Sequence, residues 1–211
     1  MTRVFEKICR TEKRFLNELY VYESAFTHKS KLVEIKKPRT LVLEKVDGIP
    51  YLDAPEITET MIIRLAQAVA ALHSVLCLEG KVLCHWDNQP KNILWDEIKQ
   101  RIILLDFEDI RLARPEADIA HLFLFWAECL SDREFLIFCR LFIRTYDKTS
   151  KLSEGQWNSA VNHSTRRFDR RRKTYGKGEG RQSQKALRNR LLLRKLFQSG
   201  GAWFRETTVP G

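Results

Sequence analysis

Several hallmarks of other protein classes are missing from this 211-residue sequence. No apolar stretch approaches the roughly 20 residues that a bilayer-spanning helix needs, and the first residues lack a signal-peptide profile. The five cysteines are odd in number and form no C-x-x-C pair, and no spacing of cysteine and histidine matches a zinc site. These absences argue against a transmembrane protein, a disulfide-stabilised domain and a zinc-binding module. We therefore expect a cytoplasmic protein with reduced, mostly buried thiols.

The residue types that carry chemistry gather between positions 85 and 108. The sequence reads HWDNQPKNIL from residue 85 and LLDFE from residue 104. Transfer of a nucleotide phosphoryl group requires a metal-binding carboxylate, an amide oxygen for a second metal, and a carboxylate that orients and deprotonates the attacking hydroxyl. Asp106, Asn92 and Asp87 are candidates for these groups. The alternative is that all three are turn or cap residues, since these types favour such positions.

Local patterns place these candidates on a plausible framework. Residues 82–84 predict a short strand that leads into a loop, and residues 93–95 and 101–105 predict the two strands of a hairpin. Asp106 would then follow the end of a strand beside Asn92. A hairpin that holds a metal-binding amide near a metal-binding carboxylate is a rigid support for a site.

The motif H-x-D-x-x-x-x-N followed by D-F-x resembles the protein-kinase-like superfamily. The DFE sequence at residue 106 and the ADIAHL sequence at residue 117 are similar to the aminoglycoside phosphotransferase and choline kinase branch. Lipopolysaccharide sugar kinases and the small kinases of tRNA modification complexes are neighbouring possibilities. The resemblance spans residues 4–126. It implies an α+β, protein-kinase-like two-lobed fold that uses ATP and Mg2+.

The resemblance also implies a role for each motif residue. Asp87 is expected to orient and deprotonate the acceptor, while Asp106 and Asn92 are expected to hold magnesium. Asp118, which lies in the ADIAHL sequence, is expected to brace the catalytic loop. The start of a helix after Pro115 explains Asp118 equally well.

The first 48 residues resemble a reduced nucleotide-binding lobe. The alternation in residues 4–9 predicts a strand that carries Lys7, and Thr11 is expected to cap a helix that carries Glu18. In the kinase family, such a lysine and glutamate pair to steady the nucleotide phosphates, although both are also ordinary solvated surface residues. A strand at residues 40–44 would enter a hinge, where Glu44 is expected to contact the nucleotide.

Two departures from the kinase pattern bear on function. Only six residues precede Lys7, which leaves no room for the glycine-rich strand pair that covers ATP phosphates, and the glycines at positions 176, 178 and 180 do not replace it. This predicts a truncated N-terminal lobe, with weak ATP affinity, a borrowed lid or lost activity, unless the start codon is mis-assigned. Nine residues separate Glu108 from Asp118, too few for a long activation loop. A compact hydroxyl compound is therefore the expected acceptor.

Helical periodicity dominates the rest of the chain. It predicts helices at residues 58–78, 119–130, 132–146 and 183–197, and we interpret their apolar stripes as core. We expect an N-terminal lobe at residues 1–48, a helical catalytic lobe at 49–163 and a basic segment at 164–211. In the last helix, Ala186, Leu187, Leu191, Leu192 and Phe197 are available to dock on the core.

Positive charge is concentrated near the C-terminus. Residues 166–195, from Arg166 to Lys195, hold thirteen Lys or Arg against two acidic residues, so the rest of the chain has a net charge near −1 when the total is +10. Such a segment attracts polyanions: RNA, an anionic membrane face or a phosphorylated glycolipid. A merely solvated basic helix is the alternative.

The sequence as a whole favours an enzyme. The predicted reaction is ATP-dependent transfer of the γ-phosphate to a hydroxyl of a small molecule or glycolipid sugar. Two alternatives remain open: a pseudokinase that serves as a binding or regulatory module, and a minimal kinase that acts on RNA or at a membrane through its basic segment.

Overall fold

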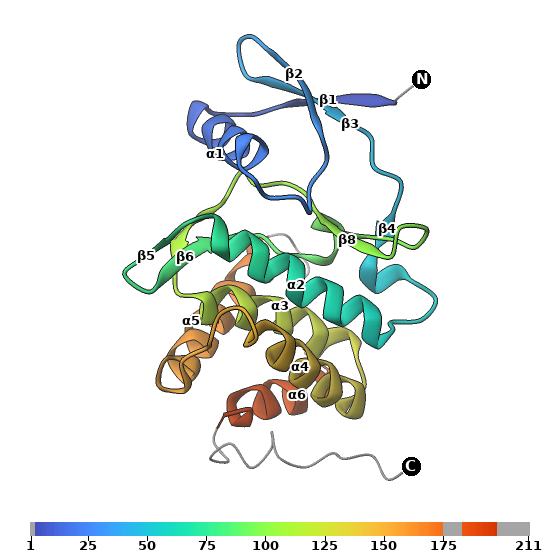
Figure 1. The fold of residues 1–211 in the computed structure, drawn as a ribbon. Coiled ribbons are helices and arrows are strands. Elements are labelled where there is room, and N and C mark those ends of the chain that lie inside the picture. Colours follow the sequence, from blue (N-terminus) through green and yellow to red (C-terminus); the bar gives the residue numbers. More distant parts are fainter. Residues whose placement is uncertain (1–2, 175–182, 198–211) are drawn as a thin grey trace. The chain divides into compact units, whose positions relative to one another are not determined.

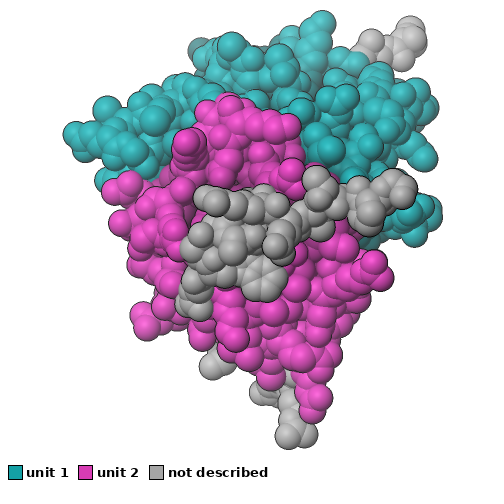
Figure 2. Space-filling model, turned by 60° about the horizontal axis from the view of Figure 1, so that its bottom comes forward, with its two compact units in different colours: residues 1–113 teal, residues 114–211 magenta. Residues whose placement is uncertain are grey.

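The structure is a computed structural model that describes residues 3–174 and 183–197 (Figure 1). The chain divides into two compact units, residues 1–113 and residues 114–211 (Figure 2). The described part of the first unit combines small sheets with two α-helices, and that of the second unit is helical. The boundary predicted after residue 48 lies within the first unit, and the boundary predicted after residue 163 lies within a helix. The three-part division stays a prediction.

The first unit begins with a three-stranded antiparallel sheet in the order β1-β3-β2. Its strands are β1 (Val4–Ile8), β2 (Leu32–Lys36) and β3 (Thr40–Glu44). Because β3 is central, Leu41, Val42 and Leu43 are buried on both of its faces. Helix α1 (Glu12–Glu23) follows β1, and the Thr11 side chain accepts a hydrogen bond from the backbone amide of Arg14, as its predicted capping role requires.

The remainder of the first unit holds α2 (Glu59–Val75) and two further small sheets. Their strands are β4 (Ile49–Pro50), β5 (Cys77–Leu78), β6 (Lys81–Cys84), β7 (Ile93–Asp96), β8 (Arg101–Leu104) and β9 (Arg111–Ala113). Short 3-10 helices occur at η1 (Tyr51–Asp53) and η2 (Pro90–Asn92). The predicted hairpin is present as β7 and β8. The predicted helix at residues 58–78 was wrong at its C-terminal end, because residues 77–78 form β5 and pair with β6.

Gly48 belongs to the predicted hinge and lies close to β7. A Cβ atom added there would stand 3.0 Å from the carbonyl oxygen of Trp95 and 3.2 Å from the Cβ atom of Leu94. Any larger residue at position 48 would push apart the paired strands β4 and β7.

The second unit contains α3 (Pro115–Cys129), α4 (Asp132–Tyr146), α5 (Glu154–Thr174) and α6 (Gln184–Lys195). Helix α3 is apolar nearly all round and contacts the other three helices, which explains why residues on every side of it are buried. Figure 1 shows α5 and α6 as separate helices around α3. Part of the basic segment is therefore core structure.

The docking face of α6 differs from the prediction. Ala186, Asn189, Arg190 and Leu193 are buried, whereas Leu187 and Leu191 are exposed. Asn189 donates to the carbonyl oxygens of Ala127 and Leu130, and the Trp157 indole donates to that of Leu193. The predicted docking set correctly included Ala186 but lacked Asn189 and Arg190, which side-chain hydrogen bonds hold on the buried face.

Neighbouring leucines on α6 test this assignment of the buried face. Leu193→Ala is expected to lower the free energy of unfolding by about 2–5 kcal/mol, because it opens a cavity in a packed interior. Leu191→Ala, at a side chain that is 56% exposed, is expected to change it by less than about 0.5 kcal/mol. Urea unfolding of both variants checks the prediction. Equal effects of the two substitutions would contradict the described packing of α6.

The described residues include no helix that is long and apolar enough to cross a membrane. All five cysteines are free thiols, of which Cys9, Cys84 and Cys139 are buried. Burial raises the pKa of the Cys9 thiol to about 11, so this group is a protonated core side chain at neutral pH.

Candidate active site

Lys7 lies among three carboxylates. Its Nζ atom donates to Glu18 Oε1 at 2.5 Å and to Asp106 Oδ1 at 2.7 Å, and it lies 3.8 Å from Glu108 Oε1. Strand β1 supplies the lysine, α1 supplies Glu18, and the loop after β8 supplies the other two. The structure thus brings together the predicted lysine–glutamate pair and the predicted metal-binding aspartate, which is 99 residues from Lys7 in sequence.

Burial and charge shift the two pKa values of the pair in the same direction. Burial raises the pKa of the Glu18 carboxyl to about 7, and the ammonium of Lys7 opposes that shift. Burial lowers the pKa of Lys7, but the carboxylates of Glu18 and Asp106 outweigh it and raise the pKa above its ordinary value. Lys7 is therefore a cation throughout the physiological range, and Glu18 titrates within it.

The Glu18 pKa predicts a pH-dependent stability. Because the folded pKa of about 7 exceeds the unfolded value of 4.5, the stabilising contribution of Glu18 is complete below pH 4.5 and is lost as the pH rises through 7. Glu18→Gln removes this titration. Relative to the parent, the variant should gain up to about 3 kcal/mol of unfolding free energy between pH 4.5 and pH 8. Urea unfolding without nucleotide measures the difference, and a difference that stays constant with pH would contradict the assigned pKa.

Asp87 is held by two amide side chains. Its Oδ2 atom accepts from Gln89 Nε2 at 2.8 Å and from Asn92 Nδ2 at 3.2 Å, and Asn92 Nδ2 also donates to the Asp87 carbonyl oxygen at 2.8 Å. Asp87 is 7% and Asn92 5% exposed. The 3-10 turn η2, which ends at Asn92, brings Asn92 back to Asp87 five residues earlier in the chain. These bonds fix the Asp87 carboxylate in one orientation.

Backbone hydrogen bonds connect the Asp87 group to the Lys7 group. The amide of Leu105 donates to the carbonyl oxygen of Asn92 at 2.9 Å, one residue before Asp106. The carbonyl oxygen of Leu105 lies 2.9 Å from His85 Nε2. Trp86 and Asp106 both have left-handed backbones, with φ values of 64° and 65°. Such φ values are rare for residues other than glycine and are typical of functional loops.

One face of α1 supports the loop that carries Asp106. Arg14 Nη1 lies 3.1 Å from Glu108 Oε2, and Asn17 Nδ2 donates to the Glu108 carbonyl oxygen at 2.6 Å. Arg14 precedes Asn17 by three residues and Glu18 by four, so the three side chains lie on the same side of α1. Arg14 and Asn17 were not among the predicted site residues. Their spacing from Glu18 was the available signal, although it did not specify the partner.

Glu18, Asp106 and Glu108 are also suitable oxygen ligands for a cation. One carboxylate oxygen of each lies within 4.8 Å of the others. Mg2+ prefers carboxylate oxygens, so this set of three carboxylates, whose negative charge Lys7 partly balances, fits the predicted metal. In the sequence, Glu108 was only part of a motif. The structure adds it to the candidate metal ligands.

Glu44 lies at the end of β3 with both backbone groups engaged. Its amide donates to the carbonyl oxygen of Lys31 at 2.9 Å, and its carbonyl oxygen accepts from the Ser30 hydroxyl. A carbonyl oxygen has a second lone pair for a ligand, whereas the amide has no second proton. The predicted nucleotide contact at Glu44 stays a prediction and is restricted to the carbonyl oxygen or the side chain.

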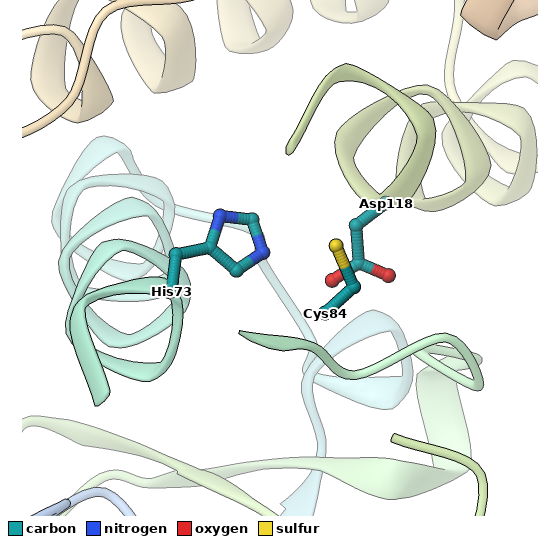
Figure 3. Close-up of side chains that lie close together, drawn as sticks. All are labelled: His73, Cys84 and Asp118. Atoms are coloured by element: carbon teal, nitrogen blue, oxygen red, sulfur yellow. The ribbon is translucent and has the colours of Figure 1, made fainter. Parts of the chain in front are cut away.

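Figure 3 shows His73 on α2, Cys84 on β6 and Asp118 on α3. All three side chains are buried, and a ring nitrogen of His73 lies within 4.8 Å of the Cys84 sulfur. Asp118 belongs to the first turn of α3, which starts at Pro115. The predicted helix start is confirmed, and the bracing role of Asp118 stays a prediction.

Residues 77–152 match the phosphotransferase enzyme family. The predicted resemblance is confirmed. This match covers the Asp87 and Asp106 motifs, and it confirms the prediction that the chain is a phosphotransferase. A search among curated proteins finds no significant match.

Solved structures with the same fold span most of the chain. A choline kinase from Streptococcus pneumoniae is 17% identical, with a TM-score of 0.60 over 94% of this chain and 87% of its own. An aminoglycoside phosphotransferase from Alicyclobacillus acidocaldarius is 14% identical, with a TM-score of 0.59 over 93% and 84%. A third, from Streptomyces rimosus with ADP and streptomycin, is 16% identical, with a TM-score of 0.55 over 73% and 79%. The protein-kinase-like fold is thus confirmed.

Proposed function

We propose that this phosphotransferase moves the γ-phosphate of ATP to a hydroxyl of a small molecule or glycolipid sugar. The observation that carries the proposal is that Lys7 Nζ lies 2.5 Å from Glu18 Oε1 and 2.7 Å from Asp106 Oδ1. The residue before Asp106 is hydrogen-bonded to Asn92, which in turn holds Asp87. A structural ion pair would need only one of the two carboxylates that contact Lys7. The likeness to a phosphotransferase solved with ADP supports nucleotide as the donor.

Each group has a task in this reaction. Asp87, oriented by Gln89 and Asn92, would accept the proton of the attacking hydroxyl. Lys7 would exchange its contact with Asp106 for the nucleotide phosphates while Glu18 holds its position. Asp106 and Asn92 would hold magnesium, which neutralises phosphate charge when bound. Most of the rate enhancement would come from positioning and charge neutralisation.

The acceptor class rests on both the sequence and the fold. The chain after Asp106 enters β9, which pairs with β6, within a few residues, which leaves no room for the long activation loop that positions a polypeptide substrate. The structures most similar to this chain include a choline kinase and aminoglycoside phosphotransferases. We propose acceptors of comparable size, and a lipid-linked sugar as the glycolipid form.

A nucleotide screen followed by an acceptor screen tests the proposal. Melting temperatures with ATP, ADP and Mg2+ establish binding, and ADP release is then followed with choline, ethanolamine, streptomycin and a lipid-linked sugar. We expect magnesium-dependent ATP binding and ADP release that depends on one acceptor class. Nucleotide binding without any turnover, including hydrolysis, would instead support a pseudokinase. Absence of nucleotide binding would exclude phosphotransfer from ATP.

A further inference from the structure

The solvent-facing side of α6 carries two exposed leucines. Leu187 is 48% and Leu191 is 56% exposed, and they lie four residues apart on one face. The buried residues of α6 occupy the opposite face and already provide its packing in the second unit. The exposed leucines therefore contribute little to the fold of this unit, and their apolar surface is available to a partner.

Basic side chains flank these leucines. At a helical period of 3.6 residues, Arg188, Arg194 and Lys195 fall on the same side of α6 as Leu187 and Leu191. Arg188 lies 2.8 Å from Asp132, in an ion pair that is largely exposed. Arg194 and Lys195 are exposed and form no ion pair with the residues that the structure describes.

Apart from Asp132, the acidic groups that contact α6 do not offset this charge. Asp169 and Glu128 both bind Arg190, at 3.0 and 3.1 Å, on the buried side of α6. Arg190 also lies 5.4 Å from the ring centre of Phe168. The acidic side chains of α3 and α5 that contact α6 are thus neutralised internally, and the exposed face keeps its cations.

The combination of exposed leucines and cations on α6 favours one class of polyanion over another. Nucleic acids bind basic faces through phosphates, and proteins that hold single strands add aromatic platforms for the bases. The exposed face of α6 has no aromatic residue. Anionic bilayers bind helices that combine an apolar strip with flanking Lys and Arg, because the strip enters the interface while the cations meet lipid phosphates.

We propose that the exposed face of α6 docks on an anionic lipid bilayer. Leu187 and Leu191 enter the interfacial region, and Arg188, Arg194 and Lys195 contact lipid phosphates. This surface shares no residue with the candidate active site, and the proposal does not depend on phosphotransfer. It gives the exposed cations of α6 a specific partner.

Co-sedimentation of the full chain with vesicles tests the proposal. Vesicles of phosphatidylglycerol and phosphatidylcholine in equal parts should bind the protein, and vesicles of phosphatidylcholine alone should not. The double variant Leu187→Gln/Leu191→Gln should lower the partition coefficient at least about tenfold. Both side chains are half exposed, so the variant should fold, which circular dichroism verifies.

Two control variants separate docking from general attraction. Leu78→Gln/Ile98→Gln alters side chains that are 56% and 94% exposed in the first unit and should leave vesicle binding unchanged. Arg166→Gln/Arg170→Gln removes two cations from the exposed side of α5, where no large apolar side chain is exposed, and should have little effect.

The matching variant on α6 removes the same amount of charge. Arg194→Gln/Lys195→Gln should lower vesicle binding about fivefold for each charge. Three results would overturn the proposal: no binding to anionic vesicles, full binding by the leucine variant, or equal losses from the α5 and α6 charge variants. Binding of RNA without binding of vesicles, insensitive to the leucine substitutions, would overturn it in favour of a nucleic acid partner.

Discussion

Asp87→Asn is expected to lower phosphoryl transfer by roughly two to four orders of magnitude, the range expected for a lost general base. Asparagine keeps the shape of the side chain and accepts hydrogen bonds from Gln89 and Asn92 through its oxygen, but it has no carboxylate to take the acceptor's proton. Steady-state ADP release with saturating acceptor measures kcat. Nucleotide affinity should survive, because Asp87 has no predicted contact with ATP.

The matched control for this variant is Asp47→Asn. Asp47 is an exposed carboxylate that pairs only with Arg3 among the described residues, so its substitution should leave kcat unchanged. Parent-like turnover in Asp87→Asn would remove Asp87 from the catalytic machinery. A loss of folding in that variant is distinguished by its melting temperature and would make the Asp87–Asn92 bond structural.

Asp106→Asn should remove most of the magnesium-dependent thermal shift produced by ATP. The triphosphate is highly anionic, and its charge must be neutralised by a metal held at the site. The substitution also removes the charge that attracts Lys7 at 2.7 Å, so the lysine keeps Glu18 as its main partner. Differential scanning fluorimetry with ATP, in the presence of Mg2+ or EDTA, measures the shift.

Asp109→Asn is the control for the metal variant. Asp109 lies three residues along the same loop and contacts Arg14 at 3.6 Å, outside the Glu18, Asp106 and Glu108 set. It should retain the magnesium-dependent shift. If Asp106→Asn retained it as well, the assignment of Asp106 as a metal ligand would be wrong.

Local patterns predicted much of the fold. The Thr11 cap, the β7–β8 hairpin and the buried helix α3 each follow from a few consecutive residues, and the structure contains all three. Strand β2 and the long helix α5 went unpredicted. Residues 32–36 include three apolar residues but are mostly exposed, and they form a strand because they pair with β3. Helix α5 is so rich in charge that its buried stripe is hard to recognise from sequence.

The candidate site was predictable where a motif carried it. Asp87, Asn92 and Asp106 lie within 20 residues of one another, and their spacing suggested a shared location. Lys7 and Glu18 required the resemblance to a family, since nothing local distinguishes them from surface residues. The contacts of Arg14 and Asn17 with the Asp106 loop join positions about 90 residues apart. Only tertiary structure reveals such contacts.

The most direct test of the central claim follows the γ-phosphate itself. Incubation with Mg2+ and ATP labelled on that phosphate should move the label to the hydroxyl of one acceptor among choline, ethanolamine, streptomycin and a lipid-linked sugar. The transfer should disappear without magnesium and fall to near background in Asp87→Asn. If ATP binds with magnesium but the label passes neither to an acceptor nor to water, the claim that this site transfers phosphoryl groups is contradicted.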